Sequence, residues 1–234
     1  MKINRAAIKQ NAKSIITTAK PSPILVGLAY LGIILILQLL SYTVTGEFQI
    51  YMKYMDQIMA GNIDYIPAMV NISVGSRLMM LAISLMILMI DTGFTVYCLN
   101  ICQFRKSGIG NLFDGCAIFF KVLLLFILTG IIVFLWSLLF IIPGIIAFYR
   151  YRQALYIMID NPQLGVLDCI KASSEMMNGR KGELFLIDLS FLGWALLTLF
   201  PFVTIWVTPY TSVTYANYYL ALRDMPHPNL DVKV

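Results

Sequence analysis

The sequence predicts an all-α fold, a polytopic membrane helix bundle of about six transmembrane helices in three out-and-back hairpins. Hydrophobic residues make up 59% of the 234 residues and charged residues 12%, with a mean hydropathy of +0.80, which excludes an ordinary soluble domain. The apolar runs have the length of helices and not the roughly 10-residue alternating pattern of a membrane barrel. Of the 17 lysines and arginines, only Lys53 and Arg77 fall in loops predicted on the outer side. This bias predicts a multi-pass protein of the cell membrane with both termini in the cytoplasm.

The N-terminal segment, residues 1–22, is predicted to be basic and cytoplasmic, with an amphipathic helix over residues 3–18. Arg5, Lys9 and Lys13 recur every four residues, and isoleucines gather on the opposite side. Each base near an anionic leaflet contributes about 1 kcal/mol, so these three side chains are candidates for contact with surface lipid. A basic tail that is simply solvated is the alternative.

The transmembrane domain is predicted to cover residues 23–222. The expected spans are 23–44, 78–102, 119–142, 145–160, 184–200 and 202–222. Helical spacing also predicts an outer interfacial helix over 46–60 and an in-plane cytoplasmic helix within 162–178. The tail, residues 223–234, is expected to be disordered.

The turn between the third and fourth spans is expected at Pro143-Gly144, because proline lacks a backbone donor and glycine tolerates a turn. The fourth span, 145–160, is short. At 1.5 Å per residue it rises about 24 Å, less than the roughly 30 Å hydrocarbon core, so it predicts either a thin or an incomplete crossing.

Charged residues inside the apolar segments predict an intramembrane polar pocket. Asp91 lies near the middle of the second span, Arg150 and Arg152 lie in the fourth, and Asp188 lies near the inner end of the fifth. A charge at such depth needs a partner or a wet cavity, so we expect Asp91 to pair with one of the arginines. The pocket would bind a lipid head group, since a guanidinium holds phosphate through its planar fork. Pairing for assembly alone, or snorkelling of the arginines, is the alternative.

A short pattern occurs twice at identical spacing. Trp136 precedes Pro143-Gly144 as Trp194 precedes Pro201, with Leu-Leu two residues after each tryptophan. Each pattern stands at the outer end of an outgoing helix, and each returning helix ends near an Asp-x-Pro sequence. We therefore expect the last two hairpins to form a parallel repeat with these residues as its signature.

Several stretches of the chain carry a resemblance to a known family. They are RAAIKQNAK near the N-terminus, LFDG near Phe113, LWSLLFIIPGIIAFYRY from Leu135, the stop Asp160-Asn161-Pro162, SSEMMNGRKGELFLIDLSFLGW from Ser173 to Trp194, and PYTSVTYANYY from Pro209 to Tyr219. The chain resembles the bacterial integral-membrane proteins grouped as domain of unknown function 975. The resemblance implies a multi-spanning, uncharacterised protein, distantly similar to the membrane domain of some glycerophosphodiester phosphodiesterases. Arg150 and Arg152 depart from the lower charge expected of relatives, which implies a role particular to this protein.

Catalytic chemistry has little support in the sequence. No nucleophile paired with a membrane histidine and no phosphate-binding glycine loop is found, so we expect neither an enzyme nor a cofactor. Asp91-Thr92-Gly93 spells an aspartic-protease signature, but that chemistry needs a second carboxylate in a matched loop. Cys98 and Cys102 share a helical face, yet the single histidine lies in the tail, so no metal site is expected.

These observations favour a non-catalytic component of the cell envelope. It would bind membrane lipids or, as partners, other membrane or cytoplasmic proteins. The net charge of +5 comes without a nucleic-acid motif and is explained by topology, so no nucleic-acid partner is expected. The alternative is a transporter or permease-like protein that moves a lipid or small amphiphile through an Asp/Arg pocket between hairpins.

Overall fold

The computed structural model describes residues 3–62 and 73–226, and this part of the chain is entirely helical, which confirms the all-α class. In chain order the elements are α1 (Arg5–Thr18), α2 (Pro23–Thr45), α3 (Glu47–Met59), α4 (Val74–Cys102), the 3-10 helix η1 (Ile109–Cys116), α5 (Phe119–Leu139), α6 (Ile141–Tyr151), α7 (Ala154–Asp160), α8 (Val166–Met176), α9 (Lys181–Leu197) and α10 (Pro201–Arg223). The expected interfacial helix is α3 and the expected in-plane helix is α8. Of the expected disordered tail, residues 227–234 lie outside the described residues.

Three helices in the described residues are long and apolar enough to cross a membrane: α2, α4 and α5. At 1.5 Å per residue, their 23, 29 and 21 residues extend about 35, 43 and 31 Å, which matches or exceeds the roughly 30 Å hydrocarbon core. These helices bury little of their apolar surface inside the protein. Long apolar helices with little buried surface are typical of a membrane protein. The other three of the six expected crossings stay a prediction.

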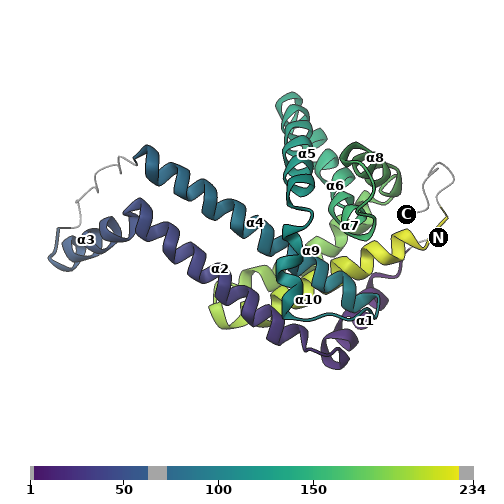
Figure 1. Ribbon diagram of the computed structural model, residues 1–234, viewed down its shortest axis with the longest axis horizontal. Coiled ribbons are helices and arrows are strands. Elements are labelled where there is room, and N and C mark those ends of the chain that lie inside the picture. The colour runs from purple at the N-terminus through teal and green to yellow at the C-terminus, as the bar shows by residue number, and fades with distance from the viewer. Residues whose placement is uncertain (1–2, 63–72, 227–234) are drawn as a thin grey trace.

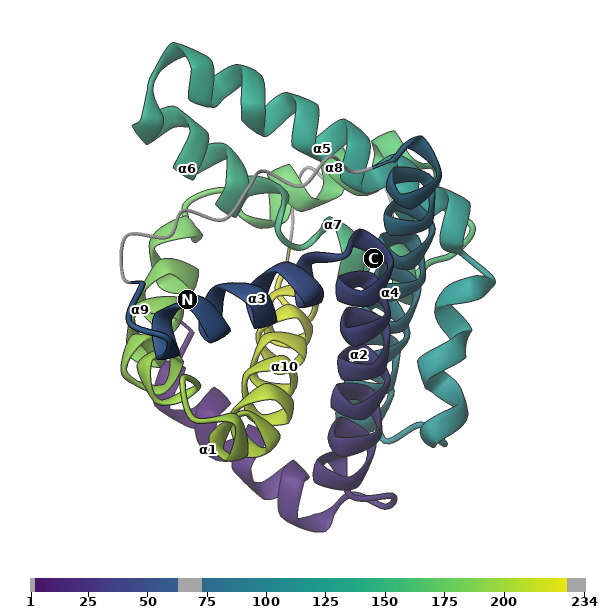
Figure 2. The same ribbon diagram turned by 90° about the vertical axis from the view of Figure 1, so that its left-hand side faces the viewer.

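The helices form a packed base from which apolar hairpins project (Figure 1). α2 and α4 lie side by side and carry α3 at their far end, whereas α5 and α6 form a second pair that runs across the first (Figures 1 and 2). The base gathers α1, α7, α8, α10 and the inner ends of α2 and α4. Its core contains large side chains with no exposed surface, including Tyr97, Leu112, Ile157 and Tyr219.

α4 passes from an exposed outer half to a buried inner half. Leu78 and Leu81 are 63% and 57% exposed, whereas Tyr97 and Leu99 have no exposed surface. In the outer half an apolar side chain that faces outward fits lipid, while in the inner half it is covered by other helices of the base. The inner ends of the hairpins are therefore the packed part of the fold.

Two glycines allow η1 to pack directly against the backbone of α4. A Cβ atom on Gly93 would overlap the carbonyl of Leu112, and one on Gly115 would overlap the carbonyl of Met89. Any larger residue would push the two helices apart, since neither collision is with a flexible side chain. The segment after α4 thus folds back along that helix before α5 begins.

The turn of the α5–α6 hairpin differs from the prediction. α5 ends at Leu139, Phe140 is extended with φ −158° and ψ 149°, and Pro143 lies in the first turn of α6. The prediction that Pro143-Gly144 forms the turn is wrong, because the first N–H groups of a helix have no intrahelical acceptor and proline is tolerated there. Gly144 serves the packing instead, since a Cβ atom at this position would collide with Ser137 of α5.

The predicted single helix over 145–160 is also wrong, because the chain breaks after Tyr151 and continues as α7. The hydroxyl of Ser173, on α8, donates to the carbonyl of Arg150 at 2.9 Å and accepts from the N–H of Gln153 at 3.2 Å. Ser173 has no exposed surface and Gln153 is 1% exposed. A buried backbone group without a partner is costly, so the serine makes the break possible.

α1 is the amphipathic helix that the sequence predicts, capped by Asn4, whose side chain accepts from the N–H groups of Ala6 and Ala7. Its apolar face packs against α10, and Ile8 and Ala12 are buried in the core. Protein therefore already covers the apolar face of this helix.

Candidate functional site

Asp188 is the centre of a polar cluster that joins three parts of the chain. In the second turn of α9, it accepts hydrogen bonds from the hydroxyls of Tyr149 at 2.8 Å and Tyr215 at 2.7 Å. Nη1 of Arg152 lies 3.7 Å from Oδ2 of Asp188. Tyr149 belongs to α6, Arg152 to the turn before α7, and Tyr215 to α10. The carboxylate on α9 is thus satisfied by the returning helices of two hairpins.

Arg152 is held between aromatic rings as well as by its ion pair. The centre of its guanidinium lies 4.9 Å from the ring of Tyr215 and 5.2 Å from the ring of Phe148. The side chains of Arg152 and Asp188 are 28% and 22% exposed. Cation–π contacts are stronger when partly desolvated, and the pair carries no net charge, so the cluster is suited to apolar surroundings.

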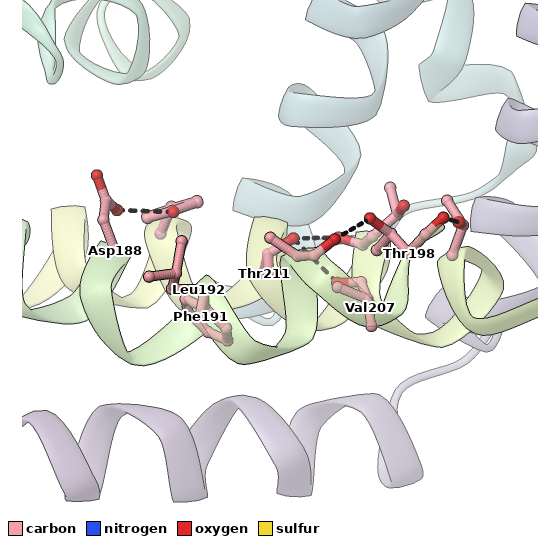
Figure 3. Close-up of a pocket in the computed structure, with 10 residues that line it drawn as sticks. Asp188, Phe191, Leu192, Thr198, Val207 and Thr211 are labelled. Carbon is pink, nitrogen blue, oxygen red and sulfur yellow. Dashed lines mark hydrogen bonds between the residues drawn. The ribbon is translucent and has the colours of Figure 1, made fainter. Parts of the chain in front are cut away.

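Asp188 also lies at one end of an open pocket of about 610 Å³ between α9 and α10. Figure 3 shows Asp188 at one end, Phe191 and Leu192 beside it, and Thr198 toward the other end. The lining residues combine apolar side chains with threonines and are Asp188, Phe191, Leu192, Ala195, Thr198, Thr204, Val207, Thr208, Thr211 and Tyr215. A carboxylate at one end of a largely apolar pocket is an arrangement that fits an amphiphile.

Three of the four threonines of this pocket present acceptors and not donors. The hydroxyls of Thr198, Thr204 and Thr211 donate to backbone carbonyls of their own hairpin, at 2.6, 3.5 and 2.9 Å. Each hydroxyl has one proton, so the free lone pairs are what remains for a ligand. No lysine or arginine is among the lining residues. These three hydroxyls therefore offer acceptors to a ligand in the pocket.

The predicted intramembrane pocket is only partly assembled. Asp188 and Arg152 come together, but Asp91 accepts a hydrogen bond from Tyr30 of α2 at 2.8 Å, and Tyr30 stacks on Phe94 at 4.4 Å. Among the ion pairs of residues 3–62 and 73–226, none joins Asp91 to an arginine. The expected pairing fails because α4 and α6 belong to hairpins that run across each other, so a tyrosine of α2 serves Asp91 instead.

Arg150 stands apart from the Asp188 cluster. Its Nε donates to Ser174 of α8, and the side chain lines a second pocket, between α5 and α6, together with Trp136 and Pro143. In the other hairpin, Trp194 contacts Tyr210 with ring centres 6.5 Å apart, and Pro201 is the first residue of α10. Trp136 and Pro143 thus line the pocket of their hairpin, whereas Trp194 and Pro201 lie near the turn of the other hairpin and are not among the residues that line the α9–α10 pocket.

Asp160 is the most highly connected carboxylate of the base, and the sequence indicated it only as a helix stop. It accepts from Gln103 Nε2 at 2.9 Å, from Tyr219 OH at 3.2 Å and from Arg223 Nη1 at 2.9 Å. Arg223 also donates to Asp224, at 3.1 Å from Nη2. A single arginine therefore holds both Asp-x-Pro stops, and the repetition of that motif is the signal that could have found the contact.

The basic stripe of α1 is divided in the structure. Lys9 is half-buried with Nζ 4.1 Å above the ring of Phe191, and its burial lowers the pKa of its amine, while Arg5 and Lys13 are exposed. Arg5 and Lys9 line a pocket of about 440 Å³ with residues of α9. Contact of these three cations with surface lipid stays a prediction.

The cysteines are free thiols, and in the described residues no group of three or more histidine, cysteine or acidic side chains is placed to hold a metal. Cys98 and Cys102 are buried in α4. Burial raises the pKa of the Cys169 thiol, on α8, to about 11, so this group is protonated at neutral pH.

The described residues form only helices, three of them long and apolar enough to span a membrane, and a polar cluster joins two of the hairpins. These features define the class of protein: an all-α protein with the features of a membrane protein. A family model described as "Protein of unknown function (DUF975)" matches residues 138–225. This region runs from the end of α5 to just beyond α10 and includes Asp188, Arg152 and Asp160. No curated protein and no solved structure matches the chain. The expected likeness to a phosphodiesterase membrane domain stays a prediction.

Proposed function

We propose that the protein is a non-catalytic component of the bacterial cell membrane that binds a lipid or similar amphiphile in the α9–α10 pocket. The observation that carries the proposal is the pocket itself, which combines apolar walls with Asp188 at one end. Apolar side chains of the same hairpin remain exposed at the protein surface, including Leu196 at 65% and Phe202 at 82%, and such surface is suited to an acyl chain.

The pocket favours a head group that donates hydrogen bonds. Asp188 and the threonine lone pairs are acceptors, whereas a lining side chain with a free cationic donor is absent from the pocket. An ammonium or hydroxyl head group would donate to these acceptors, whose remaining lone pairs face the pocket. Phosphatidylethanolamine carries such donors, while phosphatidylcholine has the same net charge and no N–H group.

The test is lipid retention measured by native mass spectrometry of the full chain in detergent. With dioleoyl phosphatidylethanolamine as probe, the wild type should retain more lipid than with dioleoyl phosphatidylcholine. Thr211→Val removes one acceptor from the pocket and should weaken retention about fivefold, the equivalent of one neutral hydrogen bond.

Thr129→Val is the matched control, since Thr129 also donates to the carbonyl four residues earlier, at 2.7 Å, but lies on α5 outside the pocket. Equal retention of the two lipids by the wild type would refute the head-group assignment. Equal loss in the two threonine variants would refute the pocket assignment.

A transporter or permease-like function is the second candidate, favoured by the assembly of the Asp188 cluster from two hairpins. Groups held by separate hairpins can be parted by a relative motion of those hairpins, as alternating access requires. Flux of fluorescent phosphatidylethanolamine across sealed vesicles tests this candidate. Protein-dependent flux that is lost in Asp188→Asn and kept in Asp91→Asn would support transport, and absence of flux in the wild type would leave binding alone.

A further inference from the structure

The α5–α6 hairpin contains a second pocket, and its chemistry is opposite to that of the first. It has a volume of about 210 Å³ and is lined by Trp136, Pro143, Ile146, Ala147, Arg150 and Tyr151. The α9–α10 pocket offers acceptors, whereas here the charged group is a guanidinium, which is a donor at every nitrogen. The two pockets therefore present opposite hydrogen-bonding groups to a ligand.

The positions of the two pockets correspond within the repeat. Arg150 lies seven residues after Pro143, and Thr208 lies seven residues after Pro201. Ile146 and Thr204 likewise lie three residues after those prolines, and all four of these residues line their respective pockets. The same place in each hairpin is thus lined by a cation in one and by hydroxyls in the other.

The charge of Arg150 is not matched by an acid. Its Nε donates to the neutral hydroxyl of Ser174, and none of the ion pairs of the described residues includes Arg150. Arg152, two residues on, is paired with Asp188. The two terminal nitrogens of Arg150 therefore remain available to an anion that comes from outside the chain.

The surroundings of Arg150 identify the source of that anion. Ile146, which lines the same pocket, is 50% exposed, Phe148 is 46% exposed two residues before Arg150, and α5 is long and apolar enough to cross a membrane. An exposed cation beside such a surface is adjacent to lipid head groups or to the acyl chains attached to them. The aromatic ring of Trp136 is typical of the head-group region as well.

We propose that Arg150 and Trp136 form a binding site for the phosphate of an anionic phospholipid, whose acyl chains lie along the exposed surface of α5 and α6. The guanidinium fork binds phosphate through its terminal nitrogens, while Ser174 fixes the side chain through Nε. This site goes beyond the proposed function, because it lies in a different hairpin and takes a ligand of a different charge.

Trp136 lines the pocket and supplies a direct readout. The full chain with Trp194→Phe and Trp206→Phe keeps Trp136 as its single tryptophan, since the chain contains three. In lipid nanodiscs, phosphatidylglycerol with brominated acyl chains should quench this tryptophan more strongly than brominated phosphatidylcholine. One cation near an anionic head group gives a preference of about fivefold.

Arg150→Gln should abolish the preference, and Arg150→Lys should keep part of it, because lysine retains the charge without the fork. Arg77→Gln, which removes an exposed cation from α4, is the matched control and should leave the preference unchanged. Equal quenching of Trp136 by the two lipids would overturn the proposal, and that comparison needs no Arg150 variant to fold. A preference that survives Arg150→Gln, or that millimolar inorganic phosphate removes, would also overturn it.

Discussion

Replacing Asp160 by asparagine is expected to destabilise the base of the protein by about 2–4 kcal/mol. The side chain of Asp160 is 6% exposed and accepts hydrogen bonds from Gln103, Tyr219 and Arg223. Removing one partner of a buried ion pair costs about 3–5 kcal/mol. Arg223 is 26% exposed and keeps its contact with Asp224, which reduces that loss. Asparagine also turns an amide donor toward existing donors, which removes one hydrogen bond worth about 1 kcal/mol.

Asp224→Asn is the matched control for this prediction. Asp224 binds the same arginine but is 68% exposed, and exposed ion pairs contribute about 0–1 kcal/mol. The measurement is unfolding of the wild type and both variants in one detergent, followed by circular dichroism. If the two variants lose the same stability, burial does not decide the strength of the Arg223 contacts and the reasoning is refuted.

The carboxylate of Asp160 should also make the protein less stable in acid. Burial alone would raise the pKa of Asp160, but hydrogen bonds from Gln103, Arg223 and Tyr219 hold the pKa below its ordinary value. Because the unfolded pKa is about 3.9, this stabilisation is complete at neutral pH and is lost below about pH 4, as the pH falls through the folded pKa. Asp160→Asn should be less sensitive to acid than the wild type in this range. Parallel pH profiles of the two proteins would contradict the assignment.

Two further substitutions test the local packing. Ser173→Ala leaves the two backbone groups at the α6–α7 break buried without their partner, so we expect the free energy of unfolding to fall by about 1–3 kcal/mol in the same assay. Ser14→Ala, on the exposed face of α1, is the control and should cause little change. Gly144→Ala should separate α6 from α5 through a collision with Ser137 and lower stability by about 1–3 kcal/mol. Gly130→Ala should be neutral or stabilising, because a Cβ atom at Gly130 would have no neighbouring atom within 4 Å. Equal unfolding midpoints for the two alanine variants would contradict the close approach of α6 to α5.

The helices could be predicted where their ends depend on local sequence. α2 begins at Pro23 and α4 ends at Cys102, as expected, because proline suits a first turn and the apolar run stops before Arg105. The break after Tyr151 could not be predicted in this way. It depends on Ser173, whose hydrogen bonds come from another helix, so no local pattern announces it.

The candidate site could be predicted in its charges but not in its contacts. Asp188 and Arg152 are unusual in apolar segments, which correctly indicates that they need partners. The choice of partner depends on the directions of the hairpins, and for that reason Asp91 is bonded to Tyr30. The partner was also hard to predict because it is a tyrosine. The chain contains 13 tyrosines, and the sequence does not show which of them donate a hydrogen bond to a carboxylate.

The repeat separates the parts of the chain that hold the fold from the parts that differ in chemistry. At the inner ends, Arg223 binds both Asp160 and Asp224, so one side chain links the two Asp-x-Pro stops. In the pockets, Arg150 and Thr208 occupy corresponding places with opposite hydrogen-bonding character. Substitution of Asp160 should therefore change stability in any lipid, whereas substitution of Arg150 or Thr208 should change which lipid is bound and leave the unfolding midpoint in detergent almost unaltered.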